Sequence, residues 1–106
     1  MKIITNNEKV KQVIENQFYQ INYGNLQRGD DTRVDFIFED AKFRSFEKSC
    51  QCTAPTLEPI NENSFKVTIH YDSNKQGTIN QFAKVHLETE NSSLEMVKID
   101  LIGHVM

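Results

Sequence analysis

Tryptophan is absent from this chain of 106 residues, and cysteine, proline and glycine are scarce, with two, two and four copies. Two cysteines cannot form the disulfide framework that small secreted domains use to support a limited core. A reducing compartment is therefore the default expectation. A chain of this length can bury a hydrophobic core without such crosslinks, so we expect a single domain spanning residues 1–106.

The chain also lacks long apolar runs and any concentration of one charge. No run approaches the roughly 20 apolar residues of a membrane span, so no membrane partner is expected. The formal net charge is only −3, and the lysines and arginines are scattered. Nucleic-acid binding needs a basic patch or stripe, so no nucleic-acid partner is expected either. The stretch Met1–Glu8 has no hydrophobic segment of the kind found in a signal peptide.

Groupings of residues that carry catalysis are missing as well. The four glycines are scattered singly and form no phosphate-binding loop, and no nucleophile accompanies a base and an orienting group. The acidic pairs Asp30-Asp31 and Glu39-Asp40 fall in turns or at strand ends, where solvated carboxylates explain them better than a calcium site. The three histidines fall at outward positions of their strands, and their spacing matches no metal-ligand pattern: His70, His86 and His104. We therefore expect no enzyme, no catalytic residue, no cofactor and no metal site.

What the sequence does contain is alternation of apolar and polar residues, the pattern of half-buried strands. The pattern occurs in Arg33–Phe38, Phe65–Tyr71, Phe82–Thr89 and Leu94–Val105, with polar turns between these runs. Six or seven such strands in about 100 residues predict an all-β fold, an antiparallel immunoglobulin-like β-sandwich of about seven strands. The inward positions predict one core formed by Phe36, Phe38, Phe65, Val67, Ile69, Val85, Leu87, Ile99 and Leu101.

The N-terminal part fits more than one structure. From Glu8 to Ile21 the apolar residues fit a helical stripe or a strand almost equally, and the aromatic, β-branched end favours a strand that Gly24-Asn25 ends. Residues Met1 to Asn7 carry the apolar pair Ile3-Ile4 ahead of any clear strand. We interpret them as an N-terminal arm that pairs with a neighbouring subunit. A frayed terminus and a first strand on the chain's own sheet are the alternatives.

Two short motifs invite a functional interpretation that turn chemistry explains better. Arg28-Gly29-Asp30 spells an integrin-recognition tripeptide, but glycine followed by aspartate is also a common turn between strands. Asn91-Ser92-Ser93 fits a glycosylation acceptor, which would require secretion. Both are expected to be turns.

Cys50 and Cys52 lie in a corner, Ser49–Pro55, where a strand-like run ends. In an extended chain their Cα atoms would be roughly 6.6 Å apart, near the upper limit for a disulfide. A bridge that closes so small a loop would add less than about 2 kcal/mol in the chain-entropy model. Packed or half-exposed thiols that folding does not require are the preferred interpretation. A disulfide and a metal site, which would need two further ligands, are the alternatives.

Several short motifs follow one another in a characteristic order. They are Tyr23-Gly24-Asn25-Leu26, Arg28-Gly29-Asp30, Cys50-Gln51-Cys52-Thr53, Pro59-Ile60 and Leu101-Ile102-Gly103-His104-Val105. This order resembles a bacterial immunoglobulin-like domain family of unknown function, which typically reads Phe-Gly-x-Ile, a Gly-Glu turn, Cys-Gly-Cys-Thr, a Pro-Gly-Glu turn and Leu-x-Gly-x-Val. Here Gln51 replaces the usual glycine, and Asn61-Glu62 replaces the Gly-Glu of the later turn. The family is similar in architecture to Hydin-like and major-sperm-protein-like modules, and the resemblance implies a domain that binds or scaffolds without catalysis.

Residues and resemblance together predict a non-enzymatic structural or interaction module. Immunoglobulin-like domains of this size often decorate bacteriophage capsids, so the first hypothesis is a virion component such as a capsid auxiliary protein. Its location would be the virion or the cytoplasm. Its partners would be other protein subunits of a larger assembly, such as capsid protein, rather than a small-molecule ligand. The alternative is a free-standing bacterial binding domain that recognises a sugar, a peptide or a metal through its loop ends.

Overall fold

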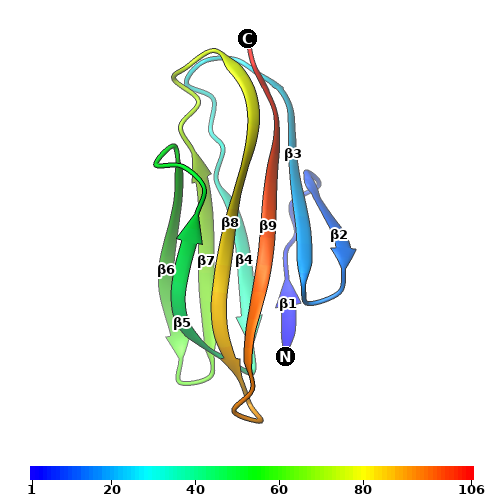
Figure 1. Cartoon of the computed structure of the whole chain (residues 1–106), viewed down its shortest axis with the longest axis vertical. Helices are drawn as coiled ribbons and strands as arrows, with labels where there is room; N and C mark the ends of the chain where they lie inside the picture. Colours follow the sequence, from blue (N-terminus) through cyan, green and yellow to red (C-terminus); the bar gives the residue numbers. More distant parts are fainter.

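The computed structural model describes all residues from Met1 to Met106 as an elongated β-sandwich, 44 × 22 × 21 Å along its principal axes (Figure 1). It contains no helix, and therefore none that is long and apolar enough to cross a membrane. Nine strands follow one another: β1 (Lys2–Ile4), β2 (Val10–Ile14), β3 (Phe18–Leu26), β4 (Val34–Glu39), β5 (Ala41–Lys48), β6 (Thr53–Asn61), β7 (Ser64–Tyr71), β8 (Gly77–Thr89) and β9 (Leu94–Val105).

The strands form two sheets, ordered β1-β4-β7-β6 and β2-β3-β9-β8-β5. The immunoglobulin arrangement places strands A, B, E and D in one sheet and G, F and C in the other. Strands β1, β4, β7 and β6 occupy the first set of positions, and β9, β8 and β5 occupy the second. The predicted immunoglobulin-like sandwich is therefore confirmed. Two details of the prediction are wrong: there are nine strands rather than about seven, and β3 runs parallel to β9.

The hydrophobic core lies between the two sheets, as the alternation predicted. All nine predicted core residues are at most 3 % exposed, which confirms that they lie on the inward face of their strands. The rings of Phe38 and Phe65 stack with centroids 4.8 Å apart, and Tyr19 packs edge-on against Phe36 at 5.7 Å. The core also includes Tyr19, Ile21 and Ile79, which the sequence pattern did not select.

The ambiguous segment from Glu8 to Ile21 is strand, as favoured, but it is two strands joined by a tight turn. Strand β2 pairs antiparallel with β3, and Asn16 takes a positive φ of 59° in the turn between them. Gly24-Asn25 does not end the strand. It forms an irregularity in the β3–β9 ladder, where Gly24 has a φ of 62° and pairing resumes at Asn25.

The interpretation of Met1–Asn7 as an arm free to pair with another subunit is wrong for its first half, because Lys2–Ile4 forms β1 on the chain's own sheet. Ile3 pairs with Phe38 of β4 and packs against the core. The free edge of β4 offers unpaired backbone groups, and an apolar residue at the inward position makes pairing within the chain favourable.

Strand β6 contains both prolines of the chain and lies at a sheet edge, where proline is tolerated in a strand. Pro55 and Pro59 pair with Ile69 and Phe65 of β7 in one unbroken register. Since proline has no backbone N–H, both nitrogens must point away from β7, towards the free edge. Leu57, midway between them, therefore supplies the one N–H that this part of the edge presents. The edge is thus poorly suited to pairing with another strand.

Candidate functional site

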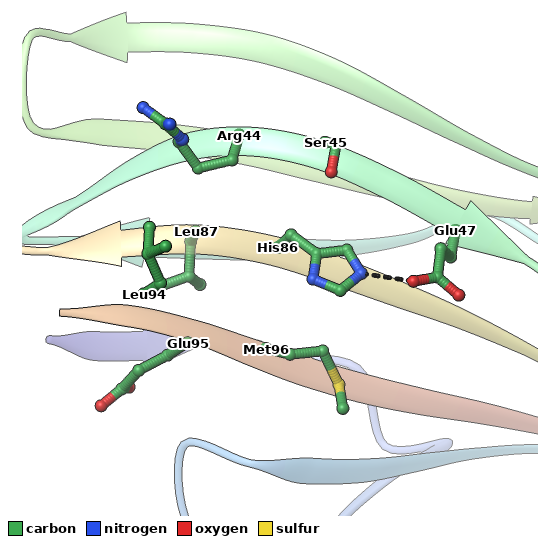
Figure 2. A pocket seen from close by; sticks show the side chains of 8 residues that line it. All are labelled: Arg44, Ser45, Glu47, His86, Leu87, Leu94, Glu95 and Met96. Atoms are coloured by element: carbon green, nitrogen blue, oxygen red, sulfur yellow. Dashed lines mark hydrogen bonds and ion pairs between the residues drawn. The ribbon is translucent and has the colours of Figure 1, made fainter.

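The outer face of the five-stranded sheet carries a shallow depression of about 500 Å³ across β5, β8 and β9. Figure 2 shows its lining, which we call the outer-face cluster: Arg44, Ser45, Glu47, His86, Leu87, Leu94, Glu95 and Met96. His86 lies at its centre, because Ser45 is its partner on β5 and Met96 its partner on β9. The depression is therefore a product of register between β5 and the β8–β9 hairpin, which are far apart in the sequence.

The polar part of the outer-face cluster is a contact between His86 and Glu47. The Nε2 atom of His86 lies 2.7 Å from Oε1 of Glu47, and the two side chains are 34 % and 56 % exposed (Figure 2). A base that activates a nucleophile must contact it. The contact with Glu47 orients the imidazole, and no hydrogen bond joins His86 to Ser45.

The apolar part consists of Leu94 and Met96 at the start of β9. Leu94 is 72 % exposed and Met96 is 40 % exposed, and both lie on the outer side of the sheet because they have the opposite parity to buried Val97. Neither residue was among those predicted from sequence, because only the inward positions of this strand carried the predicted core. The same parity rule, applied to outward apolar residues, would have found them.

Further along the same face, lysines lie over phenylalanine rings. The Lys98 ammonium is 5.6 Å from the centroid of Phe18 and 5.4 Å from that of Phe82, and the Lys84 ammonium is 5.3 Å from Phe82. Such cation–π contacts contribute about 0.5–1 kcal/mol each at exposed sites. The Lys98 ammonium also forms an ion pair with Asp100 at 3.4 Å. This face thus combines apolar, aromatic and charged groups over β3, β8 and β9.

The preferred interpretation of Cys50 and Cys52 as free thiols is wrong, because the two are joined by a disulfide. The reason is local geometry. The segment is a turn rather than an extended strand, so the Cα atoms are 5.2 Å apart, within the usual range for a disulfide. The loop contains only Gln51, and the chain-entropy model gives such a bridge about 1.6 kcal/mol of stabilisation. The bond is therefore a minor contributor to the stability of the domain.

Hydrogen bonds hold this corner, where the chain crosses from β5 to β6 and so from one sheet to the other (Figure 1). The Thr53 N–H donates to the Cys50 carbonyl at 3.2 Å, and the Asp72 N–H donates to the Cys52 carbonyl at 2.7 Å. The Cys52 N–H donates to Sγ of Cys50 at 3.0 Å. Thr53 is fully buried, and its hydroxyl has no hydrogen-bond partner.

The acidic and histidine residues weighed for metal binding are dispersed. Asp31 pairs with Arg33 through hydrogen bonds of 2.8 and 3.0 Å, and these bonds hold the pKa of the Asp31 carboxyl well below its usual range. Asp40 lies in the turn between β4 and β5, with a positive φ of 57°. No group of three or more histidine, cysteine or acidic side chains is gathered closely enough to hold a metal ion.

The tripeptide Arg28-Gly29-Asp30 lies in the turn between β3 and β4, where Gly29 takes a φ of 82°. The Arg28 side chain donates to Oε1 of Gln76 at 3.1 Å, which ties this turn to the one between β7 and β8. Turn formation therefore accounts for the glycine, as expected from the sequence.

Beneath these turns lies a buried polar network. The Tyr23 hydroxyl donates to the Thr32 carbonyl at 2.8 Å, and the Thr32 hydroxyl donates to the Tyr71 carbonyl at 2.6 Å. Burial, with a smaller effect from the negative charge of Asp31, raises the pKa of the Tyr23 phenol far above its ordinary value. The network joins β3, β7 and the β3–β4 loop at the end of the molecule that also carries the C-terminus (Figure 1).

Replacing Tyr23 with phenylalanine should lower the free energy of unfolding by about 1 kcal/mol at neutral pH, because the hydrogen bond to Thr32 is lost. Above about pH 10 the difference between parent and Tyr23→Phe should shrink. An unfolded tyrosine releases its proton there, whereas folded Tyr23 keeps it, so the parent loses about 1.4 kcal/mol of stability per pH unit. Denaturant titrations at neutral pH and near pH 11 measure this change. A difference that stays constant with pH would contradict the burial of this phenol.

Comparisons of the chain with protein-family models, with curated proteins and with solved structures give no match.

Proposed function

We propose that the chain is a non-enzymatic interaction module, an auxiliary protein of a bacteriophage virion that docks on other protein subunits through the outer-face cluster. The observation that supports docking is the exposure of Leu94 and Met96 beside His86 in a depression of the sheet surface. Covering a leucine or methionine side chain contributes about 1.5–3 kcal/mol. Apolar side chains with a polar rim are typical of protein interfaces.

A docking surface on the sheet face also agrees with the way both edges of the four-stranded sheet are built. Strand β6 presents two proline nitrogens outward, and β1 is only three residues long. Short edges and edge prolines are devices that prevent strand addition. The mixed rim of Arg44, Glu47 and Glu95 suits a partner surface with charges of both signs.

The virion setting rests on the expectation drawn from sequence. The size of the domain and its immunoglobulin-like fold suit capsid decoration. The alternative is a free-standing domain that binds a sugar, a peptide or a metal through its loop ends, and sugar binding would need exposed aromatic rings there. The large exposed hydrophobic side chains are Val13, Ile14, Leu57, Ile60, Leu94, Met96 and Met106, and none is aromatic. This composition favours docking on protein.

The double substitution Leu94→Glu, Met96→Glu should abolish attachment to the assembly without unfolding the domain. Two buried carboxylates at the interface would cost several kcal/mol, which lowers affinity by about a hundredfold or more. The measurement is co-sedimentation of a tagged chain with high-mass particles from its source cells, with the particle proteins identified by mass spectrometry.

Leu57→Glu is the matched control, since Leu57 is 39 % exposed, close to the 40 % of Met96, and lies on the other sheet. It should sediment as the parent does. A parent chain that sediments alone, or a double variant that remains on the particle, would exclude the proposed docking surface.

A further inference from the structure

The corner between β5 and β6 holds a disulfide that closes a loop around a single residue, Gln51. Both cysteines are half-exposed and Gln51 is exposed, so a thiol in solution has access to the sulfurs. We propose that Cys50–Cys52 is a thiol–disulfide exchange site, which accepts two electrons from a dithiol reductant. This proposal does not depend on the docking function of the outer face.

The first supporting feature is that hydrogen bonds independent of the disulfide hold both flanks of the corner. On the β5 side, the Ser49 N–H donates to the Phe82 carbonyl at 3.0 Å, and the Phe82 N–H donates to the Ser49 hydroxyl at 2.8 Å. On the β6 side, the Cys52 carbonyl accepts a hydrogen bond from the Asp72 N–H at the end of β7, and the Thr53 N–H donates to the Cys50 carbonyl within the turn. Because both flanks are fixed, opening the bond leaves two thiols close together. Reduction is then reversible without unfolding.

The second feature makes the two sulfurs unequal. The backbone N–H of Cys52 donates to Sγ of Cys50 at 3.0 Å, and no corresponding donor reaches Sγ of Cys52. A hydrogen bond to a sulfur stabilises its thiolate and lowers its pKa. A thiolate with a lower pKa is the better leaving group in exchange. The geometry therefore assigns Cys52 as the sulfur that is attacked and Cys50 as the sulfur that leaves.

The exchange proceeds in two steps. A thiolate of the reductant attacks Sγ of Cys52, a reductant–Cys52 disulfide forms, and the electron pair of the broken bond passes to Cys50. The second thiolate of the reductant then attacks its own sulfur in the mixed disulfide and releases the Cys52 thiolate. The reductant leaves as a cyclic disulfide, and its two protons pass to Cys50 and Cys52. Two electrons have moved from the dithiol to the cysteine pair.

Equilibration of the folded chain with dithiothreitol, followed by alkylation and mass measurement, tests the exchange. We expect full and reversible reduction in native buffer, with a cooperative melt that shifts by only a few degrees. The variant Cys50→Ser, Cys52→Ser should melt close to the reduced parent, which separates loss of the bond from damage by the reductant. Reduction that requires a denaturant, or that unfolds the domain, would overturn the proposal.

A brief exposure to glutathione, quenched with N-ethylmaleimide, tests the direction of attack. Peptide mass spectrometry should find glutathione on Cys52 and maleimide on Cys50, by about tenfold over the reverse arrangement. The same exposure in denaturant, where the Cys52 N–H no longer faces Sγ of Cys50, should remove the preference. An equal distribution in the folded chain would overturn the assignment of Cys50 as the leaving sulfur.

Discussion

Truncating Phe36 to alanine is expected to lower the free energy of unfolding by about 3–5 kcal/mol, the range for a fully buried phenylalanine. Phe36 is 0 % exposed, lies opposite Val67 in the β4–β7 ladder and packs edge-on against Tyr19 of the other sheet. Its removal leaves a cavity between the sheets that rigid strands on both sides cannot close. Chemical denaturation followed by circular dichroism measures the loss.

Phe82→Ala is the control for this substitution, because the same side chain is removed from the outer face of the other sheet. The Phe82 ring is half-exposed and contacts Lys84 and Lys98, so its loss should cost about 1 kcal/mol. Equal losses for the two variants would mean that the inward and outward faces of these strands are not as described.

The inward face of each strand could be predicted from sequence because alternation is a direct consequence of strand geometry. Val67 and Ile69 face the core while Lys66 and Thr68 face outward, and a shift of one residue would reverse all four. This rule applies wherever one side of a sheet is buried. It accounts for the correct core and for the correct class of fold.

The elements that the sequence did not favour are those that tertiary contacts create, and β1 was only an alternative interpretation of Met1–Asn7. Strand β1 is three residues long, too short for a periodic signal, and it forms because β4 offers a free edge. Strand β6 contains Pro55 and Pro59, which argue against a strand unless it lies at an edge. Edge position depends on the whole topology, and no local pattern reveals it.

The two candidate sites also differ in how far the sequence alone could reveal them. The Cys50–Cys52 pair stands out in the sequence, but its bonding depended on whether the segment is extended or turned, which the hydrogen bond from Asp72 helps to decide. The outer-face cluster joins Glu47, His86 and Met96 from three strands, and their proximity follows from ladder register alone.

The glycines of two of the motifs described from sequence lie against each other in the parallel β3–β9 pair. A Cβ atom on Gly103 would lie 2.9 Å from the Gly24 carbonyl oxygen and 3.1 Å from Cβ of Tyr23. The backbone there has a φ of 148°, in a region that side chains rarely adopt. Glycine at position 103 thus allows β9 to approach β3 where the ladder is irregular.

Gly103→Ala is therefore expected to cost about 3 kcal/mol or more, of which about 1–3 kcal/mol is backbone strain and the rest is the clash with β3. Gly77→Ala is a close control, since Gly77 has a similar φ of 142° and no atom within 4 Å of an added Cβ. It should show the strain alone. Denaturant unfolding of both variants isolates the clash as the difference between them. Equal losses for the two variants would mean that a Cβ at position 103 does not clash with β3. The two strands would then lie farther apart than their pairing, such as Ile21 with Leu101, requires.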